Sequence, residues 1–281
     1  MVRSLWSAAT GMKAQQTNVD NIANNLANVN TLGYKTKKAE FKSLLYQTLQ
    51  TRSTNNVGDA KPIPAQVGLG SRVSDITTTF TQGSLTASDS PYSIAIEGDG
   101  FFKVLMPDGK IGYTRDGSFT VSPMGDGNNA LVTSDGYQVL DQYNNPITFS
   151  ADYKASDMTV GTDGSVYVEV NGEDQRYVAV NEAGEVVYEI NIGVAQFNNP
   201  DGLDALGGNL YGETEVSGQP MEESLTEGLT RSNTHQYYLE SSNVQVVDEM
   251  VNLIVAQRAY EMNSKMITTS DEMMQQANNL R

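Results

Sequence analysis

The segment from Leu5 to Val29 reads LWSAATGMKAQQTNVDNIANNLANV, and its apolar residues recur at a spacing of seven with companions three residues later. This pattern predicts an amphipathic helix with one apolar seam, interrupted only at Gln15. Gly33 is a candidate for the left-handed residue that ends the helix. The N-terminal seam consists of Leu5, Ala8, Met12, Val19, Ile22, Leu26 and Val29.

A stripe of asparagines runs beside this seam at helical spacing. Asparagine is a poor helix former because its amide competes with the backbone for hydrogen bonds. Four of them on one helix therefore indicate a role other than helix formation. We interpret them as register-setting amides between packed helices, the role of a buried polar residue in coiled coils. They are Asn18, Asn21, Asn25 and Asn28.

The last forty residues repeat the heptad. Ser242 and Gln245 form a candidate capping box at the start of a second helix. A sustained seven-residue repeat predicts a left-handed supercoil with a partner. The companion position becomes increasingly polar at Gln257, Ser264 and Asp271. The C-terminal seam consists of Val246, Met250, Leu253, Tyr260, Ile267 and Met274, with Val247 and Ile254 beside it. The two seams can pair within one chain or between subunits.

The middle of the chain combines short apolar runs with turn signals. Seven Asp-Gly dipeptides lie between Asp99 and Gly202, and Asp-Gly favours the positive φ of tight hairpin turns. The runs at 93–96, 101–105 and 164–170 predict strands. Because no helical pattern alternates with them, we predict an antiparallel β domain and not a parallel α/β sheet.

Two stretches connect the first helix to this β domain. Residues 34–49 carry Phe41, Leu44, Leu45 and Leu49 at helical spacing, which favours a short helix. Residues 50–71 are rich in Ser, Asn, Pro and Gly and predict an extended or loop segment. A loop of this length in a compact domain indicates a specific function.

Composition excludes much enzyme chemistry. The 281 residues include no Cys and one His, which excludes disulfides, thiol catalysis and multi-His metal sites. The net charge is −16, divided between +5 in residues 1–61, from eight bases and three acids, and −21 in residues 62–281, from ten bases and 31 acids. An acidic exterior disfavours nucleic acid and anionic lipid as partners. No segment is apolar enough for a membrane helix or a cleaved secretory signal.

Local motifs for catalysis or metal binding are weak. No Asp-Gly pair satisfies the EF-hand spacing, so we interpret these pairs as hairpin turns. The neighbouring acids Glu97 and Asp99 are no convincing glycosidase pair, and His235 is better interpreted as an isolated imidazole than as a ligand. We predict no catalytic residue, no metal site and no cofactor.

Several motifs together resemble the bacterial flagellar rod and hook protein family. They cover both ends of the chain and most of the middle. The resemblance is carried by residues 21–35 (NIANNLANVNTLGYK), 68–70 (GLG), 80–85 (FTQGSL), 96–102 (IEGDGFF), 113–119 (YTRDGSF), 242–252 (SNVQVVDEMVN) and 257–263 (QRAYEMN).

This resemblance implies an α+β architecture in which the terminal helices form a coiled coil inside a helical tube, followed by an extended layer and an outer antiparallel β domain. The boundaries we expect are 1–33 with 242–281 for the helical domain, 34–75 with 212–241 for the connecting domain and 76–211 for the β domain. Residues 34–71 are our candidate for the layer that interlocks neighbouring subunits.

The function so implied is structural. Subunits would polymerise into a hollow drive shaft that carries torque across the periplasm to the hook, after delivery by the flagellar export apparatus without a cleaved signal. The implied partners are copies of the chain, other rod proteins, the hook protein and the surrounding peptidoglycan and outer-membrane ring proteins. The alternatives are another axial protein of the rod or hook type and a secreted β-domain enzyme acting on the cell wall.

Overall fold

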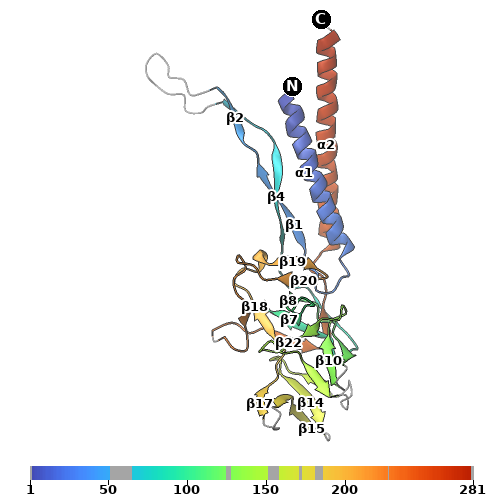
Figure 1. Ribbon diagram of the computed structural model, residues 1–281. Helices are drawn as coiled ribbons and strands as arrows, with labels where there is room; N and C mark the ends of the chain where they lie inside the picture. The colour runs from blue at the N-terminus through green and yellow to red at the C-terminus, as the bar shows by residue number, and fades with distance from the viewer. Residues whose placement is uncertain are drawn as a thin grey trace. The chain divides into compact units, whose positions relative to one another are not determined.

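The structure is a computed structural model that describes residues 2–50, 65–124, 128–150, 158–170, 173–180, 186–226 and 228–279. It confirms the α+β class, with a helix at each end and an antiparallel β region between them (Figure 1). Contacts divide the chain into two compact units, which are described separately. The helical unit is Met1–Ala27, Lys37–Thr79 and Gln245–Arg281, and the β unit is Asn28–Thr36 and Phe80–Val244.

This division differs from the three segments expected from the sequence. Residues 212–241, expected in a connecting domain, belong to the β unit, and residues 37–75 belong with the terminal helices. The part of the predicted interlocking segment that covers 51–64 lies outside the described residues.

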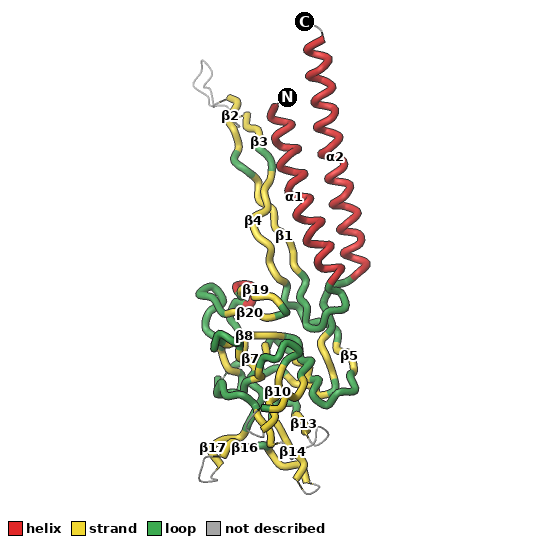
Figure 2. Tube along the Cα trace, turned by 45° about the vertical axis from the view of Figure 1, so that its right-hand side comes forward, coloured by secondary structure: helices red, strands yellow, loops and turns green. Residues whose placement is uncertain are grey.

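The helical unit is built on two long helices, α1 (Val2–Ala27) and α2 (Val246–Asn279). They run antiparallel, because Gly11 lies against Asn263 whereas Asn25 contacts Glu249. Figures 1 and 2 both show them side by side. Helix α1 ends at Ala27, earlier than predicted. Gly33 does adopt a positive φ of 65°, in the turn that follows.

Residues 37–50 form strands, so the helix predicted over 34–49 is wrong. β1 (Lys37–Ser43) pairs with β4 (Ser71–Thr78), and β2 (Tyr46–Gln50) pairs with β3 (Ala65–Gly68), both antiparallel. The two ladders make the β ribbon, defined here as residues 37–50 with 65–78 (Figure 2). Paired residues lie 28 to 41 positions apart in the β1–β4 ladder and 15 to 22 apart in the β2–β3 ladder, and a local count of apolar spacing cannot detect such pairing.

The β unit centres on a ten-stranded antiparallel sheet. Its main path runs β12-β10-β11-β7-β8-β20-β19, with β18, β21 and β9 attached beside it. The strands are β12 (Thr148–Ser150), β10 (Asn128–Val132), β11 (Gln138–Val139), β7 (Phe101–Leu105), β8 (Ile111–Thr114), β20 (Leu210–Gly212), β19 (Asp204–Gly207), β18 (Val194–Gln196), β21 (Met221–Glu222) and β9 (Thr120–Pro123).

Smaller antiparallel sheets complete this unit. The three-stranded sheet is β13 (Met158–Val160), β14 (Val166–Val170) and β15 (Glu173–Arg176). The pairs are β16 (Val178–Val180) with β17 (Val186–Glu189), β22 (Asn233–Gln236) with β6 (Ile94–Glu97), and β23 (Tyr238–Glu240) with β5 (Leu85–Ala87). A short 3-10 helix, η2, spans Pro200–Gly202.

Strand β7 is buried on both faces, which explains why its sequence is apolar except at Lys103. Successive side chains of a strand point to opposite faces. Phe102 and Val104 therefore join the main aliphatic core, whereas Phe101 joins an aromatic cluster on the other face. In that cluster Phe101 meets Phe197 and Tyr211 edge-on, with ring centroids 5.9 and 6.1 Å apart.

Only some of the Asp-Gly pairs form the positive-φ turns that the sequence predicts. Gly109, Gly136 and Gly164 adopt positive φ values of 74°, 86° and 80°. Gly100 and Gly117 do not, and they are required for close packing instead, since a Cβ on Gly117 would lie 1.6 Å from the carbonyl oxygen of Ile94. The pair Asp126-Gly127 lies outside the described residues.

No helix in the described part of the chain combines the length and the apolar character needed to cross a membrane.

Candidate functional site: a buried ion-pair junction

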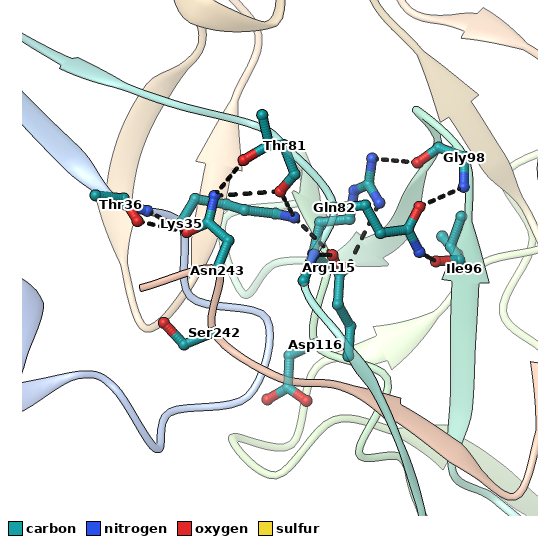
Figure 3. A network of polar contacts seen from close by, with 12 residues as sticks. Lys35, Thr36, Thr81, Gln82, Ile96, Gly98, Arg115, Asp116, Ser242 and Asn243 are labelled. Carbon is teal, nitrogen blue, oxygen red and sulfur yellow. Dashed lines mark hydrogen bonds and ion pairs between the residues drawn. The ribbon is translucent and has the colours of Figure 1, made fainter. Parts of the chain in front are cut away.

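Several of the sequence motifs quoted above meet in a buried polar cluster of the β unit (Figure 3). Its centre is Glu240, the last residue of β23, which is 1% exposed. One carboxylate oxygen, Oε1, accepts hydrogen bonds from Lys35 Nζ at 2.7 Å and from the Gly83 backbone at 2.8 Å. The other, Oε2, lies 3.4 Å from Arg115 Nη1. We call this cluster the ion-pair junction.

Two buried cations therefore share one carboxylate. Burial lowers the pKa of both Lys35 and Arg115, and Glu240 is the main opposing influence. Lys35 Nζ also donates to the Thr81 carbonyl at 2.9 Å. Arg115 Nη2 donates to the Gly98 carbonyl at 2.7 Å, and its guanidinium lies 5.0 Å from the centre of the Phe101 ring. These contacts compensate charges that would be very unfavourable alone in an apolar interior.

Asn243 ties two distant chain segments beside the ion pairs. Its Oδ1 accepts from the backbone N and the hydroxyl of Thr36, at 2.7 and 2.6 Å. Its Nδ2 donates to Thr81 Oγ1 at 2.9 Å. Thr36 is the residue before β1, and Asn243 lies three residues before α2. The junction thus fixes, inside the β unit, the segments through which the chain enters and leaves it.

Gly33 packs so closely that no side chain fits. Its backbone N donates to the Glu240 carbonyl at 2.9 Å. A Cβ on Gly33 would lie 2.7 Å from the backbone N of Asp116 and 2.8 Å from the carbonyl carbon of Arg115. Two features of this position require glycine: its positive φ and this close approach of the backbone.

Gly33→Ala is expected to destabilise the β unit by about 2 kcal/mol more than Gly109→Ala, because overpacking adds to the shared strain of positive φ. Gly109 is the matched control, with φ 74° and nothing within 4 Å of its Cβ. Urea unfolding of the full chain measures the difference. Equal losses in the two variants would contradict the packing argument.

The predicted N-terminal seam lies mainly on α1. Ala8 and Ile22 are buried, whereas Leu5, Met12, Val19 and Leu26 are partly exposed. Val29 lies beyond the end of α1 and belongs to the β unit. A shallow cavity between the helices is lined by Val19 and Tyr260, together with Gln16, Gln257 and Glu261.

The C-terminal seam divides between two faces of α2. Leu253, Ile267 and Met274 are partly buried, and Tyr260 is 43% exposed. Val246 and Met250, also predicted for the seam, are exposed. Gln257, Ser264 and Asp271 are exposed in the single chain, so they do not form the companion row of the contact between α1 and α2. The companion residues that α2 turns inward are Glu249, Ala256, Asn263 and Ser270.

The asparagine stripe makes contacts within its own chain. Asn21 and Asn25 are buried, and the Nδ2 of each donates to the Lys37 carbonyl at 2.8 Å. The Lys37 backbone N donates to Asn25 Oδ1 at 3.0 Å. Asn28 accepts from the Thr31 hydroxyl, and Asn18 is partly exposed. Two of the four amides therefore hold the β ribbon to α1, and a register role between subunits stays a prediction.

The residues considered for catalysis lie elsewhere. Glu97 is on the surface and pairs with His235 at 2.8 Å. Among the described residues, no three His, Asp or Glu side chains gather in an arrangement that could hold a metal ion.

Sequence reasoning missed the ion-pair junction. Lys35 and Arg115 appear in the sequence only as single charges within motifs, and no motif marks Glu240 as their partner. The sequence feature that could have indicated these buried charges is a single charged residue close to an aromatic one. It occurs at Tyr34-Lys35, Tyr113-Thr-Arg115 and Tyr238-Leu-Glu240. Isolated charges in apolar surroundings are rarely buried unless they are paired.

The junction positions chain segments, and the helices at both ends of the chain pack against each other. Together they define a structural protein with an inserted β unit. Profiles of known protein families match both ends of the chain and part of the β unit. The family profiles that match are "Flagella basal body rod protein" at residues 5–35, "Flagellar hook protein FlgE/F/G D1 domain" at 95–168 and "Flagellar basal body rod FlgEFG protein C-terminal" at 235–280.

Full-length relatives identify the family. The chain is 45% identical to the flagellar basal-body rod protein FlgG of Borreliella burgdorferi, over all of this chain and 99% of that protein. It is 37% identical to FlgG of Bacillus subtilis and 32% identical to the flagellar hook-basal body complex protein FlhP of the same organism, over the full length of each. The chain belongs to the FlgG family of flagellar basal-body rod proteins and is a structural subunit of the rod.

Proposed function

We propose that the chain polymerises into the distal part of the rod, a hollow helical shaft that carries torque to the hook. In this proposal the terminal helices form a coiled coil lining the tube, and copies of the chain are the principal partners. Other rod proteins, the hook protein and the peptidoglycan and outer-membrane ring proteins are its neighbours. The flagellar export apparatus delivers the subunit.

The observation that carries this proposal is the exposed apolar face of α2. Large contiguous apolar patches on a soluble chain mark interaction surfaces. This face extends over more than six helical turns, longer than a single small partner would need. Its residues, which we call the α2 apolar face, are Val247, Met250, Val251, Ile254, Val255, Met262, Met266 and Met273, each 46 to 73% exposed.

An open polymer needs contacts that repeat without closing into a ring. In this proposal the α2 apolar face provides one set of contacts, and the β ribbon provides a second. The ribbon exposes Leu45 at 82% and Tyr46 at 61%, and an isolated two-stranded ribbon is only marginally stable in water. Burial of its apolar side chains against a neighbour would order it in the assembled shaft.

Electron microscopy of concentrated full-length protein tests the proposal, and straight filaments with helical symmetry are expected. Replacing Ile254 and Val255 together with Asp should raise the critical concentration roughly a hundredfold or more, because each buried aliphatic side chain contributes about 1.5–3 kcal/mol. Replacing Gln275 and Gln276 with Asp is the control for the added charge on the same helix. A wild-type chain that stays monomeric, or a control that fails equally, would contradict the proposal.

A further inference from the structure

One carboxylate lies in the interface between the two helices. Glu249 is in the first turn of α2, and only 9% of its surface is exposed. Its near neighbours along the inward face of α2, Leu253 and Ala256, are apolar. A buried carboxylate needs hydrogen bonds or a cation to remain ionised without penalty.

The surroundings of Glu249 compensate its charge poorly. Asn25 of α1 hydrogen-bonds the carboxylate, but the Nδ2 of the same amide also donates to the Lys37 carbonyl. Within the described part of the chain, Glu249 Oε2 is buried and has no hydrogen-bond partner. A proton on the carboxyl group would remove its charge, and with the charge most of the free-energy cost of burying this group.

The charges that act on Glu249 do not favour ionisation either. From α1 it meets the uncharged amide of Asn25. From the β ribbon, Lys37 reaches this place through its backbone, which binds both oxygen and nitrogen of the Asn25 amide. On α2 itself the charged neighbour is Asp248, which repels a second negative charge. The amino end of α2 favours a carboxylate and so opposes the cost of burial, without supplying a partner for Oε2.

Burial therefore raises the pKa of Glu249; the hydrogen bond from Asn25 opposes this increase, and the neighbouring Asp248 adds a smaller increase. A group whose pKa is raised on folding stabilises the folded form while it is protonated. That contribution is fully present below the unfolded pKa and is lost as the pH rises through the folded pKa.

We infer that Glu249 is a pH-dependent contact, called the latch below. Its protonated carboxyl group stabilises the packing of α2 against α1 and the β ribbon, and its ionisation weakens that packing. Asn25 of α1 is the other member of this contact, because its amide binds Glu249 of α2 and Lys37 of the ribbon. The contact lies within one chain. It depends on the proposed function in one respect, because assembly is expected to order the two helices.

The test compares wild type with Glu249→Gln, which has nearly the same shape and no charge. Amide hydrogen exchange of α1, α2 and β1 is measured at about pH 5 and about pH 8 and corrected for the intrinsic pH dependence of exchange. Both filaments and dilute protein are used. Wild type should lose protection in these elements at the higher pH. The variant should show a much smaller loss and should exceed wild type at the higher pH.

Two controls separate this latch from other titrations. Glu272→Gln removes an exposed carboxylate of the same helix and should keep the wild-type pH dependence. Glu222 of the β unit, whose pKa burial raises to about 7, titrates between the two pH values of the test, so only the difference between variant and wild type in the helical unit is informative. Equal pH dependence in wild type and Glu249→Gln overturns the inference. Absence of filaments at both pH values overturns the proposed function instead. In that case the helices are ordered without assembly or retain only residual protection in dilute protein, and the difference in that protection between wild type and Glu249→Gln still tests the inference.

Discussion

Replacing Glu240 with Gln is expected to lower the free energy of unfolding of the β unit by about 3–5 kcal/mol, because it leaves two buried cations without their shared counter-charge. Lys35 and Arg115 are 1% and 2% exposed, so water cannot replace the lost carboxylate. For a unit of this size the loss corresponds to a decrease in melting temperature on the order of 10 °C.

Near-ultraviolet circular dichroism during urea unfolding gives the measurement, since Tyr113 and Tyr211 are buried in the β unit. Glu97→Gln is the control, because it breaks an exposed pair with His235 and should change stability by less than about 1 kcal/mol. Adding Lys35→Met to Glu240→Gln should recover part of the loss by removing one uncompensated cation. An unchanged midpoint in Glu240→Gln would show that the ion-pair junction does not stabilise the unit.

The same variant should acquire a characteristic pH dependence. Burial already lowers the pKa of Lys35, and loss of Glu240 removes the principal opposing influence. The unfolded chain then binds more protons than the folded one, so the free energy of unfolding should increase as the pH rises toward the ordinary pKa of lysine. The increase should be larger in Glu240→Gln than in wild type.

Amide exchange in α1 and α2 is expected to be fast in dilute subunits and to slow roughly a hundredfold or more on assembly, a change of about 2.7 kcal/mol in opening free energy. The helix pair buries little on its own. In α2 the buried residues are Glu249, Ala256 and Ser270, of which only one is apolar.

This burial must order the 26 residues of α1 and the 34 residues of α2. Each ordered residue costs about 1–2 kcal/mol of backbone entropy. Isolated helices with many asparagines are marginal, so additional burial must come from neighbouring copies. Disorder before assembly would also suit passage through a narrow export channel and limit premature polymerisation.

Exchange measured residue by residue on dilute protein decides this prediction. The main sheet of the β unit, with Phe102 and Leu131 fully buried, is the internal reference. Protection of both helices equal to that of the sheet in dilute protein would show that the pair is stable without assembly.

The local sequence predicted those elements whose signal is periodic or repeated. The heptads at each end of the chain correspond to α1 and α2, and the apolar run at Phe101–Leu105 is the central strand β7. Asp-Gly pairs located the turns at Gly109, Gly136 and Gly164. These signals act over a few residues, so the chain carries them independently of the rest of the fold.

Tertiary structure decided the features that depend on residues far apart in the chain. Lys37–Ser43 is a strand because Ser71–Thr78 pairs with it, although the apolar spacing of residues 34–49 as a whole suggests a helix. The inward companion position of α2 follows from how that helix packs on α1, one residue away from the position predicted.

By itself, the sequence determined the two terminal helices, the antiparallel β middle and the family, because these follow from local periodicity and from motifs. Only the tertiary structure showed that Glu240, 205 residues from Lys35, shares its charge with that lysine and with Arg115. It also revealed that Asn25 contacts both Lys37 and Glu249. Burial and electrostatic pairing depend on distances in space, and one sequence does not specify which distant charges meet.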